Sequence, residues 1–174
     1  MKKYYFIPLL ITALFSTNSY SQGYVGLSVG QGDIDSDLSD FDDPTSITIM
    51  GGYRVHNNFA VEFAYVDLGE AEDDEPPVWT LEGDGFNFSA VGILPVSNSI
   101  DLFAKAGLFM WDVTLDEEGT GEIASDDGTD FSYGVGVTGK VAGNFGLTLE
   151  YQVYDLDGDD YKNLSVGVRY LFGL

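Results

Sequence analysis

Cysteine is absent from this chain of 174 residues. Its absence excludes a disulfide framework, a thiolate nucleophile and a cysteine-ligated metal. Basic residues are scarce too, since seven Lys and Arg stand against 29 Asp and Glu, for a formal net charge of −22. Because contact with nucleic-acid phosphates needs clustered Lys and Arg, the composition excludes nucleic acid as a partner.

Histidine is nearly absent, and His56 is the single example. Hydrolases that work within membranes need a base, usually histidine, beside their nucleophile or catalytic water. The sequence places His56 in a short turn, away from the end of the molecule where such a site would lie. We therefore predict that the protein is not an enzyme and uses no cofactor.

No apolar run reaches the roughly 20 residues that a membrane-spanning helix needs. Residues 4–15 form a shorter apolar run, preceded by two lysines and followed by small polar residues with Ser19 and Ser21 at the end. This order is typical of a secretory signal peptide, and a helical anchor is the disfavoured alternative. We predict cleavage after Ser21, so that residues 1–21 are the signal peptide and residues 22–174 the mature domain.

Along much of the chain, bulky apolar residues alternate with small or polar ones. Around Glu62, for example, the bulky residues Phe59, Val61, Phe63 and Tyr65 are separated by Ala60, Glu62 and Ala64. A period of two is that of a β-strand with two unlike faces. Eight segments show it, at residues 23–32, 46–55, 59–69, 84–94, 100–113, 130–141, 145–156 and 162–173.

The connections between these segments alternate in length. Tight turns at residues 55–58, 95–99 and 142–144 separate long loops at 33–45, 70–82 and 114–129 and a shorter one at 157–161. Strands of about ten residues, tilted by about 45°, span the apolar band of an outer membrane, and outer-membrane barrels have short periplasmic turns and long outer loops. The sequence therefore predicts an all-β fold, an eight-stranded antiparallel up-and-down transmembrane β-barrel.

Charge is segregated along the chain. Most acids lie in the long loops, whereas four of the five basic residues after the signal peptide lie within strands, on the small, polar side of the alternation. A barrel explains this pattern, with bulky residues facing lipid and a few paired charges filling the lumen. The predicted lumen charge network consists of Arg54, Glu62, Lys105, Lys140, Glu150 and Arg169. A secreted β-sandwich is the alternative, but it leaves the loop alternation and the terminal Tyr170-Leu171-Phe172 unexplained.

Residues 51–54 (Gly-Gly-Tyr-Arg) and 58–69 (Asn-Phe-Ala-Val-Glu-Phe-Ala-Tyr-Val-Asp-Leu-Gly) resemble the second hairpin of the OmpA-like transmembrane domain family. Residues 103–107, 149–151 and 166–170 look like the family's fifth, seventh and eighth strands. The resemblance implies a monomeric barrel with a packed, polar interior, where some members carry a gate-like network. Glu62, Lys105, Glu150 and Arg169 match those interior positions.

The same resemblance implies a place in the outer membrane of a Gram-negative bacterium. Outer-membrane lipids, lipopolysaccharide and the barrel assembly machinery are then the expected partners. Two departures stand out. The sequence stops at Leu174 without the peptidoglycan-binding domain that many members append, and its last residue is Leu instead of Phe.

Alternating carboxylates in the loops suggest a cation site. They occur as Asp33-x-Asp35-x-Asp37 and Asp155-x-Asp157-x-Asp159. Ca²⁺ takes six to eight oxygen ligands, yet neither segment has the spacing of an EF-hand. A solvated, repulsive rim is the alternative, and no firm metal site is predicted.

Aromatic residues near strand ends indicate the girdles of a membrane barrel. The predicted girdle residues are Tyr24, Tyr53, Phe59, Tyr65, Trp79, Trp111, Tyr151, Tyr154 and Tyr170. Three functions stay open: a structural barrel of the cell envelope, an adhesin-like module whose acidic loops bind cations or surfaces, and a narrow porin-like channel. Because eight strands leave a lumen that side chains just fill, a plug is favoured over a pore.

Overall fold

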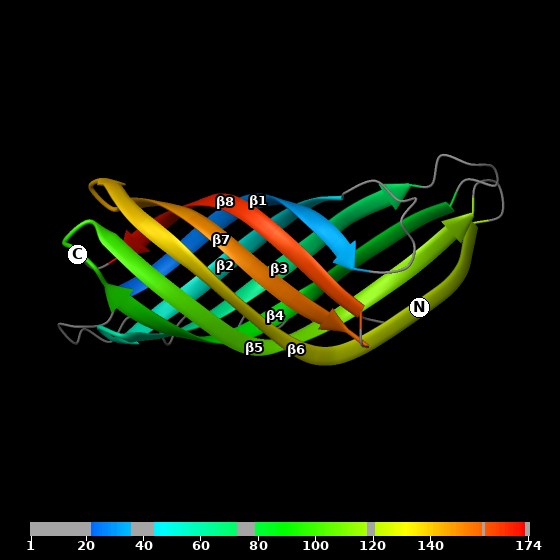
Figure 1. Ribbon diagram of the computed structural model, residues 1–174, viewed down its shortest axis with the longest axis horizontal. Helices are drawn as coiled ribbons and strands as arrows, with labels where there is room; N and C mark the ends of the chain where they lie inside the picture. Colours follow the sequence, from blue (N-terminus) through cyan, green and yellow to red (C-terminus); the bar gives the residue numbers. More distant parts are fainter. Residues whose placement is uncertain (1–21, 36–43, 73–78, 118–120, 158, 173–174) are drawn as a thin grey trace, which may run out of the picture.

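The computed structural model describes residues 22–35, 44–72, 79–117, 121–157 and 159–172. They form eight antiparallel strands: β1 (Gln22–Asp35), β2 (Thr45–His56), β3 (Phe59–Glu72), β4 (Trp79–Pro95), β5 (Ile100–Glu117), β6 (Gly121–Ala142), β7 (Phe145–Leu156) and β8 (Asp159–Phe172). Each strand pairs with the next in the chain, and β8 closes the barrel on β1 (Figure 1). The predicted fold class is confirmed. No helix within the described ranges is long and apolar enough to cross a membrane.

The two faces of each strand carry the residues that the alternation predicts. On β3, Phe59 and Phe63 are exposed on the outside of the barrel, whereas Ala60 and Glu62 are buried inside. On β8, Val168 is exposed outside and Arg169 is buried in the lumen. The outer surface is therefore apolar over the body of the barrel, as lipid contact requires.

Two of the predicted long loops contain strand, and the shorter loop predicted at residues 157–161 is strand from Asp159 onward. At residues 70–82, β3 continues to Glu72 and β4 begins at Trp79. At residues 114–129, β5 and β6 pair as far as Glu117 and Gly121, so that their hairpin runs past the ends of β1, β7 and β8 (right of Figure 1). The prediction was wrong because an apolar alternation disappears where both faces of a hairpin meet water, while its backbone pairing continues. Residues 123–127 are indeed exposed on both faces.

The opposite end of the barrel carries the three short connections, and we call it the turn end. The β6–β7 turn contains Gly143 with φ +53°, a left-handed conformation that glycine adopts without strain. Next to it, the Asn144 side chain donates a hydrogen bond to the carbonyl of Leu171 at 2.8 Å and so ties this turn to β8. The end that carries the β5–β6 extension is the loop end.

Candidate functional site

A cluster of four buried charges lies in the middle of the lumen, and we call it the charge network: Glu62, Lys105, Glu150 and Arg169. Lys105 Nζ lies 2.7 Å from Glu62 Oε1 and 2.5 Å from Glu150 Oε1. Arg169 Nη2 lies 3.5 Å from an oxygen of each carboxylate. The four side chains come from β3, β5, β7 and β8 and are all under one-tenth exposed. Their alternation places them on inward positions, and barrel closure brings them together.

The network is electrically balanced, with two acids shared by two bases. A buried charge without a partner costs several kcal/mol, so the balance is a condition for stability. Neighbouring rings hold the arrangement in place. Tyr24 donates a hydrogen bond to Glu62 Oε2 at 2.6 Å, and the Arg169 guanidinium lies 5.1 Å from the Tyr24 ring centre and 4.8 Å from that of Phe103. Such cation–π contacts stabilise a guanidinium that is removed from water.

The other two predicted network residues lie apart from these four, nearer the turn end. Arg54 Nη2 lies 3.0 Å from Asp101 Oδ2, and Lys140 Nζ lies 3.9 Å from the same oxygen. We call Arg54, Asp101 and Lys140 the mouth cluster. Sequence reasoning missed Asp101 because it stands next to a turn, where an acid is expected to be solvated. The sequence did contain a clue, because Asp101 and Lys105 are four residues apart on one strand and therefore face the same side.

Aromatic and aliphatic side chains fill the lumen on the loop side of the charge network. We call this group the aromatic layer: Met50, Ala64, Val66, Leu68, Phe109, Trp111, Tyr154 and Tyr161. The Phe109 and Tyr154 ring centres are 4.5 Å apart. Two polar atoms of the layer have local partners: Trp111 Nε1 donates to Asp130 Oδ2 at 2.7 Å, and Tyr161 Oη donates to the Leu68 carbonyl at 2.8 Å.

The predicted aromatic girdle needs correction at three positions. Tyr24, Trp111 and Tyr154 are buried in the lumen, although their closeness to strand ends suggested an interface role. They occupy inward positions of their strands, and an inward ring fills the barrel. Phe59, Tyr65, Tyr151 and Tyr170 are exposed outside, Tyr53 is half-buried, and the side chain of Trp79 lies beyond what the structure describes.

Glycines opposite the inward rings make room for them. Tyr24 pairs with Gly52 and Trp111 with Gly128 in the strand register. A Cβ atom added to Gly128 would lie 2.6 Å from Cζ2 of Trp111, so the indole ring lies against the glycine backbone. A ring that covers a glycine of the neighbouring strand fixes the register of the two strands.

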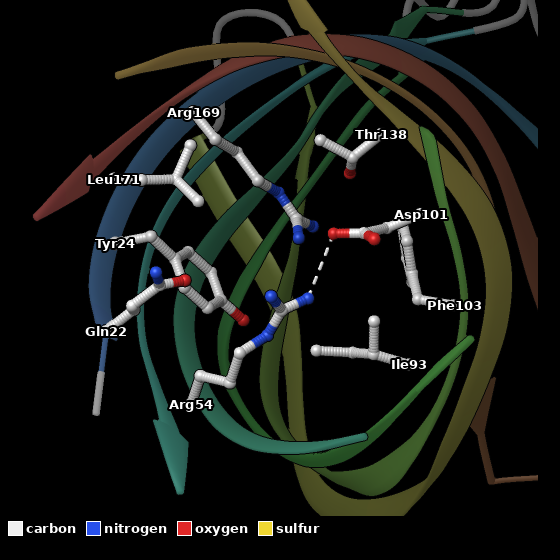
Figure 2. A pocket seen from close by; sticks show the side chains of 9 residues that line it. All are labelled: Gln22, Tyr24, Arg54, Ile93, Asp101, Phe103, Thr138, Arg169 and Leu171. Atoms are coloured by element: carbon white, nitrogen blue, oxygen red, sulfur yellow. Dashed lines mark hydrogen bonds and ion pairs between the residues drawn. The ribbon is translucent and has the colours of Figure 1, made fainter. Parts of the chain in front are cut away.

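A small cavity of about 40 Å³ opens at the turn end of the lumen (Figure 2). Its walls include Arg54, Asp101, Thr138 and Arg169, together with the rings of Tyr24 and Phe103. A cavity of this size holds a few water molecules. It stops at the charge network, and the aromatic layer lies beyond.

The residues predicted as cation ligands lie at the loop end. The register sets Asp35 of β1 and Asp155 of β7 on either side of Asp160 in β8, while Asp157 occupies the turn between β7 and β8. Asp33 pairs with Lys162, Asp159 begins β8, and Asp37 lies outside the described residues. Within the described ranges, no three His, Cys, Asp or Glu residues are grouped so as to hold a metal ion.

Two glycine patterns in the sequence match enzyme motifs but have the wrong structure for them. Residues 26–30 have the Gly-x-Ser-x-Gly spacing of a hydrolase elbow, and residues 134–139 the Gly-x-Gly-x-x-Gly spacing of a dinucleotide site. Both motifs require a strand–turn–helix, whereas these residues lie inside the continuous strands β1 and β6. Ser28 pairs with Thr48 on β2. Thr48 precedes His56 by eight residues on that strand, so Ser28 lies about 26 Å from His56, too far for histidine to act as its base.

Comparison with known proteins agrees with this architecture. A family model described as "Outer membrane protein beta-barrel domain" matches residues 7–172. No curated protein sequence matches the chain.

Solved outer-membrane proteins have a similar fold. Neisserial surface protein A aligns with a TM-score of 0.66 and 20% identity, over 85% of this chain and 96% of its own. Ail, the attachment invasion locus protein of Yersinia pestis, was solved in complex with the heparin analogue sucrose octasulfate. It aligns with a TM-score of 0.62 and 16% identity, over 90% of this chain and 100% of its own. The N-terminal β-barrel domain of Pseudomonas aeruginosa OprF aligns with a TM-score of 0.60 and 14% identity, over 87% of this chain and 99% of its own.

Proposed function

The chain belongs to the family of outer-membrane β-barrel domains, and from that premise we propose that it is a structural protein of the cell envelope whose lumen is plugged. It spans the outer membrane of a Gram-negative bacterium as a monomer, with the turn end in the periplasm. Lipids and lipopolysaccharide surround the apolar face, and the barrel assembly machinery inserts the chain. The proposed role involves no catalysis.

The observation that carries the plug is the order of the layers along the lumen. An ion that enters from the turn end meets the charge network, where each carboxylate lies within 3.5 Å of both bases. Beyond the network lies the aromatic layer, in which Phe109 and Val66 are fully buried. An ion would have to break paired charges and then shed its water among apolar rings, and a bare charge in such surroundings costs many kcal/mol.

A second function, surface binding, is favoured by the extended β5–β6 hairpin. Asp126 and Asp127 are exposed on it, in a chain whose net charge is −22. Ail was solved with a sulfated heparin analogue, which is a polyanion. An acidic surface repels polyanions, so we propose that this hairpin contacts cations, basic surfaces or lipopolysaccharide bridged by divalent ions.

Cell fractionation and gel mobility test the proposal. We expect the protein in the outer-membrane fraction, with an unboiled form that migrates apart from the boiled form in SDS gels because the closed barrel resists the detergent. Recovery in the soluble periplasmic fraction, with identical mobility before and after boiling, would contradict it. Residues 22–174 refolded into detergent micelles serve as the control for the mobility shift.

A further inference from the structure

The cavity at the turn end of the lumen has more positive than negative groups around it. The Arg54 and Arg169 guanidinium groups both point toward its centre, and the Asp101 carboxylate meets them from the facing wall (Figure 2). Arg54 is bonded to Asp101, but Arg169 is turned toward its carboxylate partners through Nη2. The Nε–H of Arg169 is buried and has no hydrogen-bond partner within the described residues. Because this atom has no surface open to the cavity, it cannot bond an occupant of the cavity, which would instead meet the Arg169 guanidinium from the side that points into the cavity (Figure 2).

The count of charges in the lumen also shows an excess of positive charge. Between the aromatic layer and the turn end, the described inward charges are four bases and three acids: Arg54, Lys105, Lys140 and Arg169 against Glu62, Asp101 and Glu150. The charge network is balanced in itself, so the excess positive charge belongs to the mouth cluster, where Asp101 faces both Arg54 and Lys140. One negative charge in the cavity would balance the lumen.

We propose that this cavity is a binding site for a small inorganic anion of the halide class, held by Arg54 and Arg169 of its wall. Lys140 lies outside the wall and adds its charge from behind Asp101, 3.9 Å from that carboxylate. The volume of about 40 Å³ admits a halide with a little water and is too small for an organic carboxylate of several carbons. The hydroxyl of Thr138 and the side chain of Gln22 are further donors in its wall. The cavity is reached from the periplasmic side, so its occupant comes from solution.

Two substitutions move the cavity charge in opposite directions. Lys140→Gln removes the excess positive charge and leaves Asp101 bonded to Arg54 at 3.0 Å. Asp101→Asn removes the one carboxylate of the mouth cluster and nearly keeps the side-chain shape. A unit charge at contact range in partly solvated surroundings changes an ion affinity by about tenfold. Lys162→Gln, on the outward side of β8, and Asp130→Asn, on β6, make the same exchanges toward the loop end, away from the cavity, and serve as controls.

The measurement is the urea midpoint of the folded barrel in detergent micelles during titration with sodium chloride or bromide. Sodium gluconate keeps the ionic strength constant, because gluconate is too large for the cavity. We expect a saturable rise of the midpoint with halide in the unmodified protein. The halide concentration at half-saturation should be about tenfold higher in Lys140→Gln, about tenfold lower in Asp101→Asn, and unchanged in both controls.

Diffraction from crystals soaked in sodium bromide gives a second readout that does not depend on any variant. An anomalous peak between Arg54 and Arg169 is expected. A midpoint that responds equally to halide and gluconate, or crystals with no bromide peak in the cavity, would overturn the proposal. Equal halide dependence in Lys140→Gln and Lys162→Gln would overturn it as well, because the response would then be a general effect of charge.

Discussion

Replacing Arg169 by methionine removes one base from a network in which two acids share two bases. Glu62 and Glu150 would then share Lys105 alone, at 2.7 and 2.5 Å, and one negative charge would stay buried without compensation. Breaking a buried ion pair in this way costs about 3–5 kcal/mol. Arg169 also contacts the rings of Tyr24 and Phe103, and methionine keeps much of that apolar contact. We therefore expect a loss of about 3–5 kcal/mol in the free energy of unfolding.

Adding Glu150→Gln to Arg169→Met should restore much of this loss, because the remaining Lys105–Glu62 pair is neutral. Glu62→Gln should rescue less well, since Tyr24 donates a 2.6 Å hydrogen bond to the Glu62 carboxylate and would lose its charged acceptor. The assay is urea unfolding of the folded barrel in detergent micelles, arranged as a double-mutant cycle with Asp112→Asn, an exposed position, as the uncoupled control. Costs that simply add, within about 0.5 kcal/mol, in both rescue pairs would refute the coupled network.

Three further predictions concern the lipid face, the lumen and the chain start. Val168→Arg puts a charge on the lipid face and should cost about 2–4 kcal/mol at the bilayer midplane, measured by unfolding in lipid vesicles. Gly167→Ser, on the inward side, should also destabilise, because a Cβ there would lie 2.7 Å from the Leu27 carbonyl oxygen; unchanged stability in the same assay would contradict the tight lumen. Phe109→Ala empties part of the aromatic layer and should cost about 3–5 kcal/mol, whereas exposed Phe88→Ala should cost clearly less in detergent. Intact-mass measurement of membrane-extracted protein should give a chain that starts at Gln22, and a retained N-terminus would contradict the signal peptide.

The sequence predicts the barrel well because each membrane-spanning strand has two unlike environments. Lipid on one side and packed lumen on the other impose the alternation of Phe59, Val61 and Phe63 with Ala60 and Glu62. The β5–β6 extension has water on both sides, so residues 123–127 carry no such signal, and strand was taken for loop. Only the backbone register of the hairpin shows that they are paired.

The sequence predicts which charged residues face the lumen better than it predicts which of them contact one another. Parity puts Arg54, Lys105 and Arg169 in one lumen, but how far each lies along the barrel depends on the stagger between strands, which local sequence does not specify. The partner Asp101 and the inward rings of Trp111 and Tyr154 were missed because an acid near a turn is expected to be solvated and a ring near a strand end is expected at the interface. Each lies near a strand end in sequence, and the stagger decides whether a strand end meets the interface or the packed lumen.

Planar-bilayer recording of the refolded barrel tests the closed lumen most directly. With the aromatic layer and the paired charge network in series, we predict that the unmodified protein adds no steady conductance to the bilayer at moderate voltage. Phe109→Ala combined with Trp111→Ala removes two rings of that layer and should raise the frequency of conducting events. A steady conductance of the unmodified protein, altered in ion selectivity by Lys105→Met, would contradict the plug and show that ions pass through the charge network.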